Sequence, residues 1–175
     1  MVNLYKNNKS VLVFLFRAFC IYLGWMLFYY GWLYNHRGFD DLIIRHLIWI
    51  CSFVLEKSGF DSFYGFRTIG IRGSQGLIVS PVCDGLSLFV LFSGFIVAFP
   101  GNVRSKAVFI ASGLVIIDLL NCMRILALVL IFRFSPESLE FNHSYTFTLI
   151  LYLAVFGMWI RWIRKSVPQK KNQME

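Results

Sequence analysis

The length and spacing of four apolar runs constrain this 175-residue chain more than any other feature. They cover about residues 11–34, 84–99, 106–132 and 145–163. A helix needs roughly 20 apolar residues to cross about 30 Å of hydrocarbon, so each run reaches or approaches the length of a membrane span. The chain is 58% hydrophobic and only 15% charged, which leaves too little polar surface for a soluble domain of this size. The sequence therefore predicts an all-α integral membrane protein with about four transmembrane helices.

The positive charges predict how the chain is oriented. Lys and Arg number 17, against 9 Asp and Glu. Three basic clusters flank the apolar runs, namely Lys6 and Lys9, then Arg104 and Lys106, then Arg161, Arg164, Lys165, Lys170 and Lys171. Charges at the ends of apolar runs indicate membrane orientation and no nucleic-acid partner. Four crossings put all three clusters on one side, so we expect a cytoplasmic membrane protein with both termini in the cytoplasm.

No repeat or low-complexity tract divides residues 1–166, which we expect to form a single polytopic membrane domain before a polar cytoplasmic tail at 167–175. The apolar segment 41–55 is too short for an ordinary span, and a fifth crossing would place the basic termini on opposite sides. We interpret it as an interfacial or re-entrant helix on the outer face. Short β-branched and aromatic stretches between 60 and 80, separated by glycines, predict a small extracytoplasmic hairpin.

Counting along these helices brings three reactive side chains to the outer membrane boundary. Cys83 directly precedes the second apolar run, and His143 directly precedes the fourth. Arg124 lies about 27 Å along the third helix from Lys106, at a rise of 1.5 Å per residue. The three residues are distant in sequence, yet we expect them to lie in one plane.

These three residue types suit acyl transfer. The positive end of a helix dipole and nearby cations favour the thiolate, which makes Cys83 a candidate nucleophile. The His143 imidazole could take the thiol proton and later protonate the leaving amine. The Arg124 guanidinium could stabilise the oxygen of a tetrahedral intermediate. No cofactor and no metal is expected.

Other polar residues near this plane are expected to support the site. Asn121 and Asp118 share a helix face with Arg124, so we expect Asn121 to orient Arg124 and Asp118 to meet Arg17 or a buried water. An acid next to a thiol opposes thiolate formation, so Asp84 is expected to cap the second span or to pair with Arg124. The remaining cysteines, which are Cys20, Cys51 and Cys122, are interpreted as packing residues.

The same residues carry a family resemblance. The pattern of Cys83 and Gly85, then Asn121 and Arg124, then His143 resembles the Cys-x-Gly, Asn-x-x-Arg and His signatures of the exosortase/archaeosortase family, in its compact Bacteroidetes-type form. The resemblance covers about residues 59–162. It implies a multi-pass cysteine transpeptidase that processes C-terminal sorting signals. It also implies partners that are exported proteins ending in a short motif, a transmembrane helix and a basic tail.

Two other functions stay open. A thiol-disulfide membrane enzyme would need a second cysteine at the depth of Cys83, and Cys122 comes nearest. A non-catalytic assembly subunit or small transporter would depend on Asp118 and Arg17 and not on Cys83. The leading hypothesis is a membrane-embedded cysteine peptidase or transpeptidase that works through a Cys83 thioester at the outer face of the membrane.

The orientation makes a testable prediction, because residues 35–82 lie outside only if the basic clusters share the cytoplasmic side. An alkaline phosphatase fusion after Gly73 should be active, and one after Lys106 should be inactive. Enzyme activity in cells expressing each fusion at matched levels measures this. The reverse pattern would place Cys83 in the cytoplasm and contradict the proposed topology.

Overall fold

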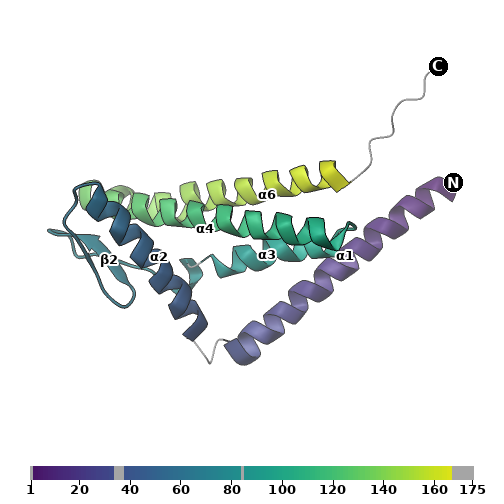
Figure 1. Ribbon diagram of the computed structural model, residues 1–175, viewed down its shortest axis with the longest axis horizontal. Coiled ribbons are helices and arrows are strands. Elements are labelled where there is room, and N and C mark those ends of the chain that lie inside the picture. Colours follow the sequence, from purple (N-terminus) through teal and green to yellow (C-terminus); the bar gives the residue numbers. More distant parts are fainter. Residues whose placement is uncertain (1, 34–37, 84, 167–175) are drawn as a thin grey trace, which may run out of the picture.

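The computed structural model describes residues 2–33, 38–83 and 85–166, and it is 81% helical (Figure 1). In chain order the elements are α1 (Val2–Phe28) with a π-helical turn (Tyr29–Leu33), α2 (Gly38–Lys57), β1 (Ser62–Tyr64), β2 (Thr68–Ile71), β3 (Leu77–Ile78), a 3-10 turn (Pro81–Cys83), α3 (Leu86–Ala98), α4 (Val103–Phe134), a second 3-10 turn (Pro136–Ser138), α5 (Leu139–Phe141), a second π-helical turn (Asn142–Thr146) and α6 (Phe147–Ser166). The predicted polar tail at 167–175, Tyr34 and Asp84 lie outside the described residues.

Three of the described helices are long and apolar enough to cross a membrane, at Val11–Leu33, Val103–Phe134 and Pro136–Ser166. This supports the prediction of an all-α membrane protein. The predicted span at 84–99 corresponds to α3, which is shorter, because its helix covers only Leu86–Ala98. At 1.5 Å per residue, α3 extends for about 20 Å and falls short of a full hydrocarbon crossing. The fourth crossing therefore remains a prediction.

Helices α3, α4 and α6 pack side by side (Figure 1). Their shared core consists of Phe92, Ile96, Ile117, Val155 and Trp162, each no more than 1% exposed. A glycine at 113 makes this packing possible, because a Cβ there would lie only 2.2 Å from the Phe92 ring. A tight connection joins α3 to α4, with Asn102 capping α4 through a bond from the Arg104 amide and Lys106 donating to the Val97 carbonyl.

A second core joins α2 and the strands to the C-terminal half of α4. It contains Ile44, Leu47, Ile48, Cys51, Leu55, Ile69, Ile71, Val79, Cys122, Ile125 and Val129. The strands form an antiparallel sheet in the order β1-β2-β3, so the predicted hairpin gains a third strand. The ion pair between Arg67 and Asp41 fixes the sheet to the start of α2. Helix α2 is longer than the predicted segment 41–55, and it is not among the three candidate spans.

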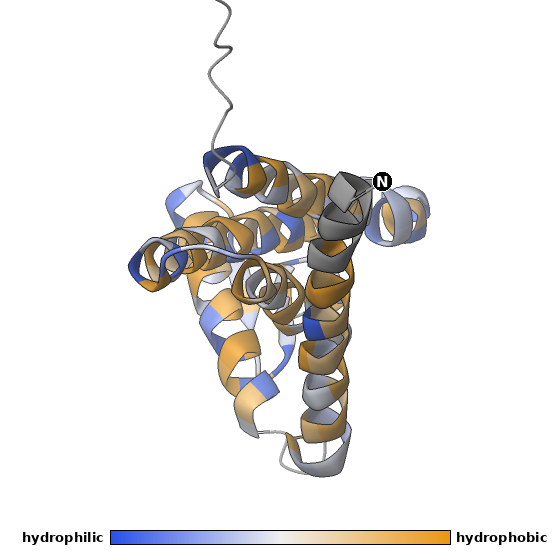
Figure 2. Cartoon of the chain, turned by 90° about the vertical axis from the view of Figure 1, so that its right-hand side faces the viewer, coloured by the Kyte–Doolittle hydropathy of each residue, from blue (hydrophilic) through white to orange (hydrophobic). Residues whose placement is uncertain are grey.

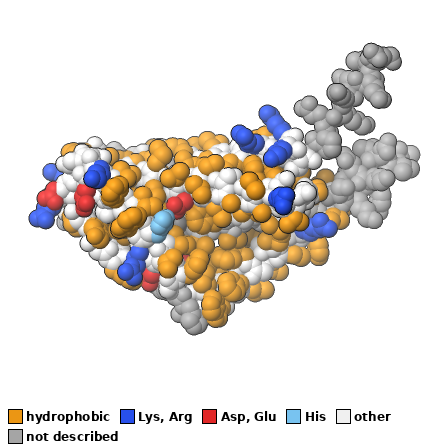
Figure 3. Space-filling view, in the orientation of Figure 1, with side chains coloured by type: hydrophobic (Ala, Val, Ile, Leu, Met, Phe, Trp, Pro, Cys, Tyr) orange, Lys and Arg blue, Asp and Glu red, His pale blue; other side chains and the backbone are white. Residues whose placement is uncertain are grey.

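Helix α1 packs mainly against α3, where Phe14 makes edge contacts with Phe95 and Phe99. It diverges from the other helices along its length (Figure 1), its coloured part is mostly hydrophobic (Figure 2), and many of its apolar side chains are exposed. An apolar band also crosses the visible face of the molecule between its two charged ends (Figure 3). Exposed apolar surface on this scale is what contact with lipid requires.

Candidate active site

The structure brings Cys83, Arg124 and His143 together from three different elements. The Cys83 Sγ lies 3.1 Å from the His143 Nε2, which is hydrogen-bonding distance for a thiol and an imidazole. The Arg124 Nη2 lies 3.8 Å from the same sulfur. All three side chains are half-buried. The sulfur of Cys83 therefore lies next to both a base and a positive charge.

Cys83 is held in a tight turn directly before α3. It ends the 3-10 turn that begins at Pro81, and its amide donates to the Ser80 carbonyl at 2.8 Å. Helix α3 begins only at Leu86, because Gly85 adopts a left-handed conformation with φ 84°. The sequence predicted a span from about residue 84, and the helix begins two residues later. In this turn the thiol lies against His143.

Asn121 fixes this turn in place. Its side chain is fully buried, and its Nδ2 donates to the Cys83 carbonyl at 3.0 Å. A Cβ at position 85 would lie 3.1 Å from the same Nδ2. Position 85 therefore requires glycine for two reasons, which are its positive φ and the close approach of Asn121. We expected Asn121 to orient Arg124, but its bond is to the Cys83 main chain.

His143 lies in the π-helical turn Asn142–Thr146 that leads into α6. Single π-helical turns inside helices are frequent at functional sites, because the extra residue changes the direction of a side chain. The Thr148 hydroxyl donates to the His143 carbonyl at 3.1 Å, and the side-chain amide Nδ2 of Asn142 donates to the Ser138 carbonyl at 2.9 Å. These bonds satisfy backbone groups around the irregular turn. Nothing in the sequence predicted this π-helical turn.

The positive charge of Arg124 is not neutralised by any described carboxylate, since the ion pairs in the described ranges join other residues. Its Nε is buried and has no hydrogen-bond partner within the described part of the chain. Asp84, the expected partner, is outside that part. The guanidinium can therefore offer donors to a bound anion or carbonyl oxygen next to the thiol.

Asp118 is not part of this cluster. Its carboxylate lies 3.3 Å from the His46 Nε2 of α2, so the expected contact with Arg17 is wrong. The reason is the packing order, because α2 lies against α4 whereas α1 packs on α3, where Arg17 is exposed. The His46–Asp118 pair joins two helices and leaves the site to the other three residues.

The other cysteines lie in different surroundings. Cys51 and Cys122 are buried, and the Cys51 thiol lies 3.6 Å from the Cys122 carbonyl. The contact with Cys122 and the burial of the group raise the pKa of Cys51, which keeps that thiol protonated. Both residues pack in the core, as the sequence predicted. Cys20 is exposed on α1, so the packing role predicted for it is wrong.

A cavity of about 440 Å³ opens beside Cys83, between α3, α4 and α6. This volume is within the usual range for ligand sites. The sequence did not single out the other residues that line it, which include Ser87, Leu88, Ser144, Thr148 and Tyr152. The hydroxyl groups of Ser87, Thr148 and Tyr152 lie within apolar runs and gave no separate signal. In the described ranges, no group of three or more His, Cys, Asp or Glu is placed to hold a metal ion.

No family model, curated protein or solved structure matches the chain. The resemblance to exosortases is therefore an expectation based on the motif residues. The structure gives those motifs one physical connection. The glycine of the Cys-x-Gly pattern makes room for Asn121 of the Asn-x-x-Arg pattern. Asn121 then binds the main chain of Cys83.

This connection predicts that Gly85→Ala displaces Cys83 from His143. An added Cβ would meet Asn121 and would also have to adopt a positive φ, which costs about 1–2 kcal/mol. Gly59→Ala is the matched control, because Gly59 has φ 85° but nothing within 4 Å of its Cβ position. Both variants should lower the thermal unfolding temperature in detergent by similar amounts. Only Gly85→Ala should slow the reaction of Cys83 with a maleimide, and equal maleimide rates in both would contradict the role of Asn121.

Proposed function

We propose that this chain is a membrane-embedded cysteine peptidase or transpeptidase that cleaves the C-terminal sorting signals of exported proteins. The observation that carries the proposal is the thiol–imidazole contact of 3.1 Å between Cys83 and His143, with Arg124 at 3.8 Å from the sulfur. A cavity lies directly beside this sulfur. The resemblance of the motif residues to exosortases supports the substrate class.

In the first step His143 accepts the thiol proton of Cys83 at Nε2, and the thiolate attacks the carbonyl carbon of the scissile peptide. A C–S bond forms, and the carbonyl oxygen becomes negatively charged. Arg124 is close enough to the sulfur to donate to that oxygen. Because no described carboxylate neutralises the guanidinium, its charge is available for the oxyanion.

In the second step the tetrahedral intermediate collapses, and the C–N bond breaks. The protonated His143 gives its proton to the leaving amine, which departs with the C-terminal helix of the signal. The N-terminal part stays on Cys83 as a thioester. An incoming amine, hydroxyl or water then attacks the thioester, and His143 takes up the proton of that nucleophile. The C–S bond breaks, and the proton passes from His143 to the sulfur, which regenerates the thiol. Transfer and hydrolysis differ only in the attacking group.

The position of the site within the fold suits such a substrate. Cys83 directly precedes α3, and the end of α3 that begins there is the end nearer the sheet, whereas the basic start of α4 and the basic end of α6 lie at the other end of the bundle (Figure 1). With the predicted topology, this end faces the outside of the cytoplasmic membrane. The cavity lies between membrane helices, so a transmembrane segment in the bilayer could present the residues preceding it to Cys83.

The alternatives predict different reactive groups. A dithiol mechanism needs a second thiol facing Cys83, whereas the polar contacts of the Cys83 sulfur among the described residues are with Ser80, His143 and Arg124. An assembly subunit or transporter would rely on Asp118, which pairs with His46. The geometry of the described residues therefore favours the thioester route.

Arg124→Lys tests the role of the guanidinium. Lys keeps the charge but loses the planar arrangement of donors, so processing of a co-expressed substrate should fall by about 10²-fold. The substrate is a protein from the same genome that ends in a short motif, an apolar helix and a basic cluster. Arg133→Lys on the same helix is the control and should keep full activity. Normal processing by Arg124→Lys at normal expression would remove Arg124 from the mechanism.

Cys83→Ala should abolish processing, whereas simultaneous Ala substitutions at Cys20, Cys51 and Cys122 should leave it nearly intact. The reason is that a thioester route needs one thiol and no disulfide partner. Processing is measured as the mobility shift of the substrate on gels. Loss of activity in the triple variant would favour dithiol chemistry, and an active Cys83→Ala protein would end the proposal.

The same variants allow two direct checks on the covalent step. His143→Ala should inactivate the protein and slow the reaction of Cys83 with a membrane-impermeant maleimide at neutral pH, because the base that takes the thiol proton is gone. A substrate fragment trapped on the wild-type protein should be released by hydroxylamine. Unchanged maleimide rates in His143→Ala would show that His143 does not activate the thiol.

A further inference from the structure

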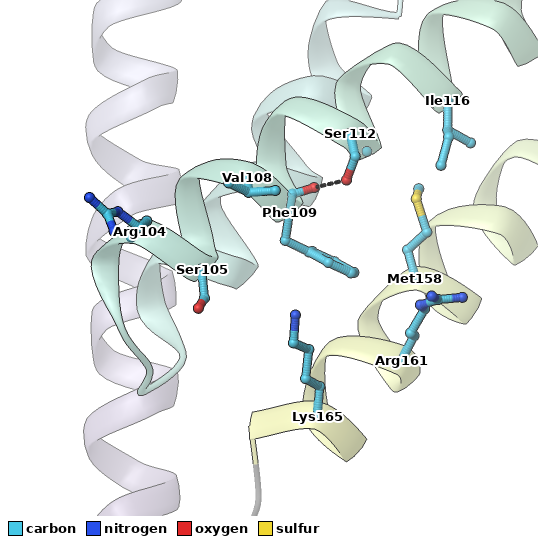
Figure 4. Close-up of a pocket in the computed structure, with 10 residues that line it drawn as sticks. Arg104, Ser105, Val108, Phe109, Ser112, Ile116, Met158, Arg161 and Lys165 are labelled. Carbon is cyan, nitrogen blue, oxygen red and sulfur yellow. Dashed lines mark hydrogen bonds between the residues drawn. The ribbon is translucent and has the colours of Figure 1, made fainter.

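A second hollow lies at the opposite end of the bundle from Cys83. It is a groove of about 680 Å³ between the start of α4 and the end of α6, and we call it the basic groove (Figure 4). Arg104, Arg161 and Lys165 stand around it, and Val108, Phe109 and Met158 are among its apolar lining residues. The proposed peptidase mechanism uses none of these residues.

The cations of the basic groove are not neutralised within the described part of the chain. None of the ion pairs found there includes Arg104, Arg161 or Lys165. The nearby Lys106 differs from them, because its ammonium donates to the Val97 carbonyl and closes the end of α3. Basic side chains gather without acidic ones at this end of the molecule in the visible face (Figure 3).

The groove is apolar between these cations. Phe109 lies in it between α4 and α6, and its ring also contacts Trp162 at 5.0 Å between centroids. The Phe92 ring fills the space directly beneath Gly113, so the groove is closed on its inner side and opens outward. Val108 at its edge is 66% exposed. The result is a hydrophobic surface with positive charge around it.

The arrangement of the cations indicates which kind of anion fits. Lys165 extends from α6 toward α4, whereas Arg104 points away from α6 at the first turn of α4 (Figure 4). A small inorganic anion needs donors that converge on one point, and these do not. An anion attached to a hydrocarbon chain would satisfy both parts of the groove, with its charge among the cations and its chain along Phe109 and Val108.

We propose that the basic groove binds an anionic phospholipid, with the phosphate near Arg161 and Lys165 and an acyl chain between α4 and α6. Basic pockets between membrane helices on the cytoplasmic side commonly hold such headgroups. The predicted topology places this end in the cytoplasmic leaflet, where anionic lipids supply the ligand. The bound lipid joins α4 to α6 at the end of the bundle opposite the Cys83 site. The proposal does not depend on peptidase activity.

Native mass spectrometry of the full chain in detergent tests this with dioleoylphosphatidylglycerol and dioleoylphosphatidylcholine as probes. The anionic lipid should bind at least about fivefold more tightly than the zwitterionic one. Lys165→Gln should weaken its binding by about fivefold, because one basic group near a membrane surface changes affinity by roughly that factor. Arg164→Gln is the matched control, since Arg164 is the adjacent basic residue on α6 and does not line the groove. It should change binding by less than about twofold.

Two further measurements complete the test. A substitution that changes no charge tests the apolar part of the groove, and competition with phosphate distinguishes the lipid from a free anion. Val108→Trp should weaken lipid binding by filling the apolar part while leaving every charge in place. Inorganic phosphate at millimolar concentration should not displace the lipid. The proposal would be overturned if both lipids bound equally, or if Lys165→Gln and Arg164→Gln lost the same amount of lipid affinity. It would also be overturned if Val108→Trp had no effect on lipid binding, or if phosphate displaced the lipid. Unchanged thermal unfolding of the lipid-free variants shows that the losses do not come from misfolding.

Discussion

The hydrogen bond from Asn121 to the carbonyl of Cys83 is the contact on which the site depends. It joins the turn before α3 to a buried position on α4, and Gly85 provides the space for it. An amide donor buried in an apolar bundle needs a partner, so this bond is strongly preferred over an unsatisfied Asn121 Nδ2. Once the turn is fixed, the sulfur of Cys83 faces His143 and Arg124. The reactive geometry is therefore a consequence of packing between two helices.

The other polar contacts in the half of the molecule that carries the sheet assemble the parts around this site. The pair of His46 with Asp118 joins α2 to α4, and the pair of Arg67 with Asp41 joins the sheet to α2. Each pair compensates the cost of placing polar groups next to an apolar core. Arg124 has no such acidic partner among the described residues, although it is half-buried. A cation kept near a thiol in this way is a feature that a structural role alone does not require.

The two ends of the bundle carry different chemistry. The end with the sheet holds a thiol, an imidazole and a guanidinium around a cavity, and the other end holds cations around an apolar groove. The band between them is apolar (Figure 3). This division follows from the bilayer, because charged groups are tolerated only near its two surfaces unless they are paired. The proposed cysteine site near one surface and the proposed lipid site near the other are compatible with one small bundle.

The sequence by itself determined the long helices and the relative positions of the polar residues along them, because span length and helical rise are set by the bilayer and the backbone. Counting along the third run was enough to place Arg124 at the level of Cys83 and His143. Only the tertiary structure decided which neighbours the polar side chains meet. Asn121 binds Cys83 and Asp118 binds His46, since these contacts depend on which helices pack together. The left-handed Gly85, the π-helical turn at His143 and the basic groove likewise arise from packing, which hydropathy and residue spacing do not encode.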